Sequence, residues 1–313
     1  MNRSLLAPVL ASCLAIGAFG QTLSKRSVPV IRPYAGALAL PTTTYTMTYN
    51  GGPLINSGPA TIYTIFYGKA WTQLERQIVN NFLHHLGGTK TYNIDAGYFD
   101  GAGTHVPNSL LHDSVLDATN VGYSHGRNLS DAQIQQVVAD AIKAGKLPVD
   151  TNGVYVVMTD PTVTSSALGG FCVTQCGYHF NSSTISPGDD IKYAFVGNAG
   201  NLCPQGCSAP AVIGDTTSPN SDIGVDGAVS VLWHELSEAI TDPNPNSGWT
   251  DPTYGEIGDE CAWQFGTVRA VANGSHANQH LGNRDYLIQL MPLLGNTKVG
   301  PDTWDTTCVQ RTK

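Results

Sequence analysis

The residues with the clearest potential for chemistry are His234-Glu235-Leu236-Ser237-Glu238, an H-E-x-x-E pattern. Apolar residues recur around it at three- and four-residue spacing, which predicts an amphipathic helix over Val225–Thr241. One helical turn separates His234 from Glu238, so both side chains lie on the same face. H-E-x-x-H helices hold zinc with their two histidines in this geometry and use the inner glutamate as general base. Here the second ligand position holds a carboxylate, which zinc also accepts. The sequence therefore predicts a metal centre with His234 and Glu238 as ligands and Glu235 as base.

A third ligand is expected from the segment after the helix, which follows a loop rich in proline, asparagine and glycine. The spacing resembles that of gluzincin metallopeptidases. That resemblance implies Glu256 as the third ligand and Asp259 as the residue that orients His234. Asp242, Asp251 and Asp259 itself remain alternative ligands. Imidazole and carboxylate donors favour Zn²⁺, and a carboxylate-rich set also suits Ca²⁺ or Mn²⁺. The alternative interpretation is a solvated His–Glu pair on a helix surface.

A hydrolase would need a second group to stabilise the oxyanion that forms during attack on a carbonyl. Tyr254, Tyr178 and His179 are the candidates, and nothing in the sequence selects among them. His179 lies among closely spaced cysteines, which favours a structural role. The adjacent pair His84-His85 stands at the predicted end of a helix and points in two directions, which is typical of surface residues.

The N-terminal region predicts export. Arg3 precedes an apolar run that ends near residue 20, which is typical of a signal peptide. The dibasic pair Lys25-Arg26 then predicts a processing site. We expect a signal peptide over residues 1–20, a propeptide-like extended lead-in over residues 21–45, and one domain over residues 46–313. No other segment predicts a membrane span.

Composition agrees with a secreted protein. The 313 residues include only 13% charged residues, with 34 glycines and 18 prolines, which favours a compact, loop-rich extracellular chain. The formal net charge of −8 argues against nucleic acid or anionic membranes as partners. The sequons at Asn128, Asn181 and Asn273 predict surface glycosylation.

Cysteine usage also points to an oxidising compartment. Six cysteines remain once Cys13 leaves with the signal peptide, an even number that predicts three disulfides. We expect Cys261 to pair with Cys308, which would tie the C-terminal tail to the loop of the metal site. The pairing among the other four stays open, and the alternative is a zinc knuckle; these residues are Cys172, Cys176, Cys203 and Cys207.

Regular elements alternate in a way that predicts an α/β fold, or alternatively an α+β fold, with one central sheet covered by helices. Asp226 is the expected cap of the motif helix, and Tyr286–Met291 is the only regular segment expected after it. The predicted strands are Thr46–Asn50, Thr61–Tyr67, Val154–Met158 and Ile191–Val196, and the predicted helices are Trp71–Leu86 and Asp131–Ala144.

Six segments carry a family resemblance: Tyr49–Leu54, Ile65–Lys69, Phe171–His179, Val196–Asn198, Cys203–Cys207 and Asp222–Gly227. Together they resemble the EXORDIUM family, also called the phosphate-induced protein 1 family, of secreted plant proteins and their microbial relatives. The resemblance implies secretion and a shared fold, and an association with the cell wall and growth responses rather than an established enzymatic activity. The segment at His234–Glu238 departs from the plant members, which generally lack the H-E-x-x-E residues.

Two functional hypotheses follow. The first is a secreted metal-dependent hydrolase, most simply a zinc peptidase that acts on extracellular polypeptides with Glu235 as base. The second is a non-enzymatic extracellular protein of the EXORDIUM type that acts in cell-wall interaction or signalling. In that case the histidine and carboxylates form a structural or residual metal site.

Overall fold

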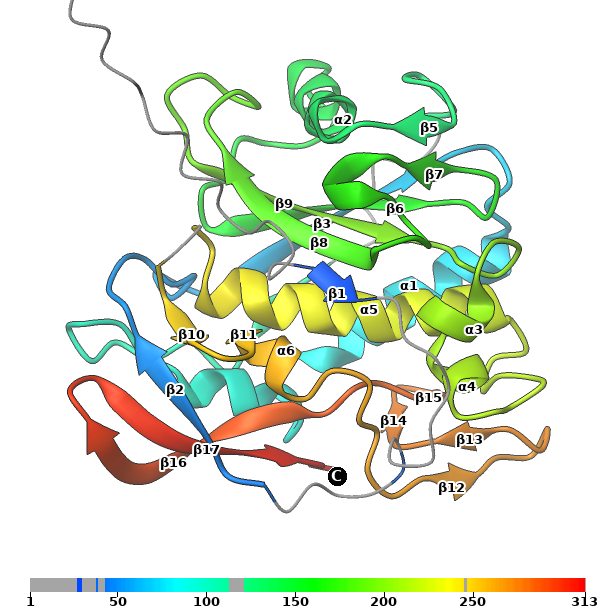
Figure 1. The fold of residues 1–313 in the computed structure, drawn as a ribbon. Helices are drawn as coiled ribbons and strands as arrows, with labels where there is room; N and C mark the ends of the chain where they lie inside the picture. The colour runs from blue at the N-terminus through cyan, green and yellow to red at the C-terminus, as the bar shows by residue number, and fades with distance from the viewer. Residues whose placement is uncertain (1–26, 30–37, 39–42, 113–120, 245–246, 313) are drawn as a thin grey trace, which may run out of the picture.

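The computed structural model describes residues 27–29, 38, 43–112, 121–244 and 247–312. The predicted signal peptide, the dibasic pair and most of the lead-in lie outside the described residues. The described chain is a single mixed α/β unit in which two sheets enclose the motif helix (Figure 1). The predicted α/β class is confirmed.

The larger sheet has six strands in the order β1-β8-β9-β6-β3-β4. Its central strands β3, β6 and β9 are parallel and contain the three predicted apolar runs, which are buried on both faces as expected for a parallel sheet covered by helices. Strand β8 is antiparallel to β9, and β1 is antiparallel to β8. The strands are β1 (Ser27–Pro29), β3 (Ala60–Tyr67), β4 (Leu110–Leu111), β6 (Gly153–Thr159), β8 (Gln175–Ser182) and β9 (Ile191–Gly197).

Helices cover both faces of this sheet. Helix α2 (Asp131–Lys143) lies on one face, and α1 (Gln73–Leu86) and α5 (Ile223–Thr241) lie on the other (Figure 1). Thr72 and Ser130 begin the first two helices with capping boxes. In α1, Ile78, Phe82 and Leu86 are buried as the pattern predicts, whereas Leu74 is exposed.

The second sheet is antiparallel, with the order β11-β10-β2-β17-β16. Tyr286–Met291 was expected to be the only regular segment after the motif helix, and this expectation was wrong: the long hairpin β16–β17 follows it. Most of β16 is half-buried or exposed and rich in polar residues and glycine, so it lacks the alternation that identifies a strand. The strands are β2 (Tyr45–Tyr49), β10 (Trp249–Asp251), β11 (Gly255–Glu256), β16 (Met291–Gly300) and β17 (Thr303–Val309).

The remaining elements are short. They are η3 (Tyr92–Gly97), β5 (Asn128–Leu129), β7 (Thr164–Ser165), η5 (Ala167–Gly169), α3 (Pro204–Cys207), α4 (Ala209–Val212), α6 (Ile257–Glu260), β12 (Arg269–Ala270), β13 (His276–Ala277), β14 (Gln279–Leu281) and β15 (Arg284–Tyr286).

Helix α5 is the central element of the fold. It lies between the two sheets in Figure 1, and every residue from Gly224 to Thr241 is buried. The sequence predicted an amphipathic helix with one solvent-facing side. The prediction of a helix is correct, but the helix is buried on all sides. Its cap is Asp222, whose carboxylate accepts a hydrogen bond from the backbone of Val225. The predicted cap, Asp226, is instead a buried first-turn residue that accepts two hydrogen bonds from Asn220.

Three disulfides join the six cysteines, so the zinc-knuckle alternative is excluded. Cys261 is joined to Cys308, the pair expected from the sequence. The other bridges are Cys172–Cys203 and Cys176–Cys207, which tie β8 and the residues before it to α3.

Burial of α5 generates a stability prediction. Leu236 is 1% exposed, so Leu236→Ala should lower the free energy of unfolding by about 2–5 kcal/mol through lost burial and a cavity. Chemical denaturation measures the difference. The control is Leu74→Ala on α1, where the side chain is 48% exposed and the change should stay below about 1 kcal/mol. Equal effects for the two variants would contradict the central position of α5.

Candidate metal centre

Six ionisable side chains from four elements gather beside α5, and together they are called the buried cluster. Strand β8 brings one residue, α5 three, and β11 and α6 one each. Five of them are at most 2% exposed, and the sixth, Asp259, has a side chain that is 10% exposed. The cluster consists of His179, His234, Glu235, Glu238, Glu256 and Asp259.

The first group of converging donors is His234, Glu238 and Asp259, whose ligand atoms lie within 4.8 Å of one another. His234 Nε2 is 2.9 Å from Glu238 Oε1 and 3.7 Å from Asp259 Oδ1. Neither ring nitrogen of His234 and neither oxygen of Glu238 has a hydrogen-bond partner among the described residues. The two groups are thus close without hydrogen-bond geometry, which is the arrangement expected of two ligands that share one ion.

The second group is His179, Glu235 and Glu238, also within 4.8 Å. His179 Nδ1 lies 3.3 Å from Glu235 Oε2 and 3.7 Å from Glu238 Oε2. On the other side of the ring, Nε2 is 3.2 Å from the backbone carbonyl oxygen of Asp242. Both ring nitrogens therefore face oxygens that accept: Nδ1 is at hydrogen-bond distance from Glu235 Oε2, and Nε2 donates to the carbonyl oxygen. With Nε2 holding the hydrogen of a neutral ring, Nδ1 is the nitrogen that would bind an ion placed between it and the carboxylates. Metal-binding histidines are commonly held by such a backbone acceptor.

The structure places Glu256 and Asp259 differently from the expected roles. Glu256 Oε1 lies 3.5 Å from His179 Nε2, and Glu256 belongs to neither group of converging donors among the described residues. Asp259 stands with His234 and Glu238 as a third donor, at a distance too long for the expected hydrogen bond to His234. Gly258 permits this approach, because a Cβ there would lie 2.8 Å from Glu238 Oε1 and 2.9 Å from ring carbons of His234.

The spare aspartates have other surroundings. Asp251 accepts hydrogen bonds from the backbone of Thr253 and Tyr254 and from the hydroxyl of Thr46, so it holds a turn and a strand edge. Asp242 contributes its carbonyl oxygen to the cluster, as the acceptor for His179.

The three candidate oxyanion donors lie in different parts of the structure. Tyr178 donates its hydroxyl hydrogen to Asp131 of α2, on the opposite face of the sheet from the cluster. Tyr254 is 46% exposed and packs edge-on against Tyr45. Of the three candidates named from the sequence, His179 alone belongs to the cluster.

The position of His179 could not be assigned from spacing in the sequence. Side chains alternate along a strand, and the aromatic ring of Tyr178 points toward α2. A Cβ on Gly177 would meet Val231 and Glu235 of α5, so Gly177 and His179 share the face that packs on the motif helix. This alternation identifies His179 only after the side on which α5 lies is known.

A separate buried carboxyl group lies on another side of α5. Asp95 is fully buried, and burial raises its pKa to about 8, an effect that the neighbouring Ser237 hydroxyl offsets only in part. At neutral pH this group is therefore mainly protonated in the folded chain.

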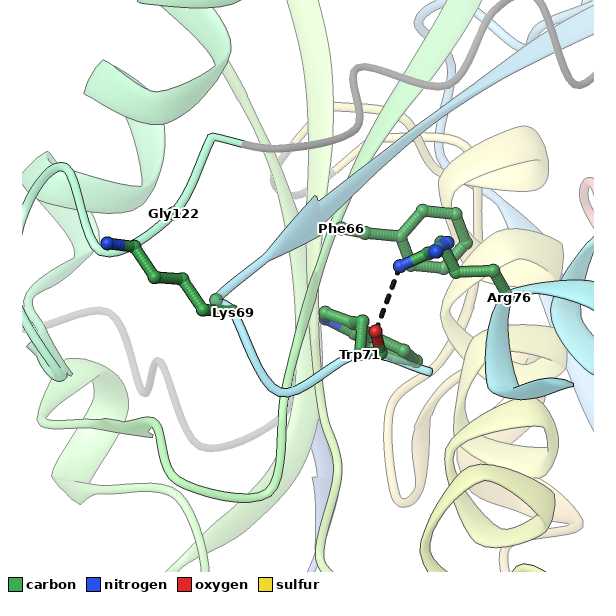
Figure 2. Close-up of a pocket in the computed structure, with 6 residues that line it drawn as sticks. Phe66, Lys69, Trp71, Arg76 and Gly122 are labelled. Atoms are coloured by element: carbon green, nitrogen blue, oxygen red, sulfur yellow. Dashed lines mark hydrogen bonds between the residues drawn. The ribbon is translucent and has the colours of Figure 1, made fainter. Parts of the chain in front are cut away.

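The cavity in Figure 2 is distinct from the cluster. It has a volume of about 380 Å³ and lies where β3 leads into α1. None of the cluster residues lines it; its lining is Phe66, Gly68, Lys69, Trp71, Arg76 and Gly122.

Among the described helices, none has the length and apolar character that crossing a membrane requires.

The fold and the cluster define a disulfide-bonded α/β protein with a buried group of histidines and carboxylates. Residues 47–279 match the phosphate-induced protein 1 conserved region, and the chain belongs to this family. It is 33% identical to Protein EXORDIUM-like 5 of Arabidopsis thaliana over 260 residues, which cover 76% of this chain and 69% of that protein. No solved structure gives a significant match.

Two further relatives carry EXORDIUM-like or PHOSPHATE-INDUCED names. Protein EXORDIUM-like 3 of Arabidopsis thaliana is 29% identical over 274 residues, covering 78% of this chain and 79% of the relative. Protein PHOSPHATE-INDUCED 1 of Nicotiana tabacum is 29% identical over 218 residues, covering 64% of this chain and 66% of the relative. The resemblance drawn from the sequence segments is confirmed at the level of the family.

The raised pKa of Asp95 generates a pH prediction. Between about pH 4 and pH 8 the folded chain binds a proton at Asp95 that the unfolded chain has released, so stability from this position falls as the pH rises. Asp95→Asn cannot ionise and should remove that fall, making the variant increasingly favoured over the wild type across this window. The expected size is on the order of a few kcal/mol. Chemical denaturation at pH 4, 6 and 8 checks it.

A matched variant, Asp302→Asn, removes an exposed carboxylate and controls for the loss of one negative charge. If the difference between Asp95→Asn and the wild type were independent of pH, Asp95 would not be a protonated buried group.

Proposed function

We propose that this chain is an extracellular, non-enzymatic protein of the EXORDIUM type in which the buried cluster holds a divalent metal as a structural centre. The observation that carries the proposal is the burial of the motif. Glu235, the expected general base, is 0% exposed, and a base must come within hydrogen-bond reach of a substrate or its attacking water. In the fold described here Glu235 faces His179 and Gly177 of β8 instead of solvent.

The case for a metal rests on His234 and Glu238. Leaving a buried polar atom without a partner costs roughly 1–3 kcal/mol, and more for a charged group. Within the described chain, both nitrogens of His234 and both oxygens of Glu238 are buried without a hydrogen-bond partner. Nε2 of His234 and Oε1 of Glu238 are nevertheless only 2.9 Å apart. A cation between them would satisfy both donors at once, which supports a metal over a chance pair.

The donor types support a borderline or moderately hard divalent ion. Imidazole nitrogen and carboxylate oxygen suit Zn²⁺ and Mn²⁺, and the second histidine makes Ca²⁺ a poorer fit than the sequence alone suggested. Zinc–ligand bonds of about 2.0–2.2 Å place two donor atoms of one ion about 3–4 Å apart, similar to the distances within the cluster.

Location and partners follow from the cysteines and the family. Three disulfides persist best in an oxidising compartment, and the relatives carry the names EXORDIUM-like and PHOSPHATE-INDUCED. These features support secretion, with a cell-wall component or an extracellular polypeptide as the partner. The formal net charge of −8 argues against nucleic acid or an anionic membrane as the partner.

One observation favours a second candidate, a latent metal-dependent hydrolase. Strand β1 begins directly after Lys25-Arg26, pairs with β8 at Val28↔Gly177, and also contacts α5 (Figure 1). Displacing β1 would open the edge of β8 beside Glu235, which would then accept a proton from an attacking water. A bound divalent ion supplies such sites with a water of lowered pKa and a polarised carbonyl.

Metal removal tests the proposed function. At a free concentration a thousandfold above the dissociation constant, a bound ion contributes about 4 kcal/mol, so chelation should lower the melting temperature by roughly 8–16 °C. Differential scanning calorimetry of the secreted protein measures this shift. His234→Ala should remove the response to chelator, whereas His280→Ala, at an exposed histidine beside Asp285, should retain it.

Casein hydrolysis by the same samples separates the two candidates. The structural role predicts no turnover with or without the chelator. Turnover that chelator abolishes and Glu235→Gln removes would instead support the hydrolase. If no chelator changed the melting temperature, the metal centre would be contradicted, and with it both the structural role and the hydrolase.

A further inference from the structure

We infer that the buried cluster is a dinuclear centre, with two divalent ions bridged by the carboxylate of Glu238. The inference rests on the proposed metal centre and specifies its composition. A single ion held by His234 and Glu238 would leave the second group of converging donors, around His179, without an ion. The two groups share Glu238 and differ in their histidine.

The two oxygens of Glu238 face different imidazoles. Oε1 is 2.9 Å from His234 Nε2, and Oε2 is 3.7 Å from His179 Nδ1. A carboxylate placed in this way binds one ion through each oxygen. Bridged two-metal sites hold their ions about 3.5–4 Å apart, a separation that a single carboxylate spans. Both oxygens are fully buried and have no hydrogen-bond partner among the described residues, so nothing described competes for either position.

Each side of the bridge has its own donors. One ion takes Nε2 of His234, Oε1 of Glu238 and Oδ1 of Asp259. The other takes Nδ1 of His179, Oε2 of Glu238 and Oε2 of Glu235. The bond from His179 Nε2 to the carbonyl oxygen of Asp242 directs the Nδ1 lone pair to the second position.

Charge agrees with two ions. When ionised, the carboxyl groups of Glu235, Glu238, Glu256 and Asp259 carry four negative charges, and imidazoles that bind a metal through a lone pair add none. One divalent ion offsets half of that charge, and two offset all of it. Ionised carboxylates in a protein interior are costly unless a cation compensates them. Carboxylate-bridged di-iron and di-manganese proteins likewise combine two histidines with carboxylates, four in their case and three in the donor groups described here.

Counting bound ions tests the inference. The full secreted protein is stripped with chelator, saturated with Zn²⁺ or Mn²⁺, desalted and analysed by mass spectrometry for metal per chain. The wild type should hold two ions. His179→Ala and His234→Ala should each hold one, Glu238→Gln should hold fewer than the wild type, and the surface control His280→Ala should hold two.

The Mn²⁺-loaded wild type gives a second readout that needs no variant. Two Mn²⁺ ions bridged by one carboxylate are magnetically coupled, so the electron paramagnetic resonance spectrum at saturation should differ from that of isolated Mn²⁺. One ion per wild-type chain would overturn the dinuclear centre while leaving the proposed metal site intact. No retained ion would overturn both, and two ions with an uncoupled spectrum would place the second ion outside the cluster.

Discussion

Helix α5 carries a histidine and two glutamates into an interior where an ionised group persists only with a compensating partner. The helix has no solvent-facing side, because β8 and β9 of the larger sheet and helices α1, α3, α4 and α6 all pack on it. Water therefore cannot solvate the polar side chains of α5, and the segments packed on α5 must bring groups that interact with them. Strand β8 brings His179 and α6 brings Asp259.

The disulfides stabilise these cluster-bearing segments. Cys176 and His179 lie on the same strand, and the Cys176–Cys207 bridge ties that strand to α3, which packs on α5. Cys261 directly follows α6, and its bridge to Cys308 ties the segment of Asp259 to β17. Gly258 then allows the backbone of α6 to approach His234 and Glu238 closely. A structural centre needs segments held in this way, since metal affinity falls when ligands must be ordered at binding.

The sequence predicted those parts of the site that depend on local periodicity. The spacing of His234 and Glu238 determined their contact, because one helical turn brings them together in any fold. The apolar runs similarly identified the parallel strands. The cysteines around His179 favour a structural role, and its place in the cluster could not be predicted because it depends on which face of β8 meets α5, a long-range contact. The same limit applies to Glu256 and Asp259, whose directions depend on the turn at Gly258, and to the polar hairpin β16–β17.

The burial of the H-E-x-x-E motif connects the family, the fold and the site in one account. The H-E-x-x-E spacing suggests hydrolysis, whereas its burial supports a structural centre in a family whose named relatives are EXORDIUM-like proteins. The most direct measurement of the central claim is anomalous X-ray diffraction from crystals of the purified protein, collected at the absorption edge of the bound metal. The account predicts anomalous density beside both oxygens of Glu238, within about 2.0–2.2 Å of His234 Nε2 on one side and of His179 Nδ1 on the other. A cluster without anomalous density, closed by hydrogen bonds between His234 and Glu238, would contradict it.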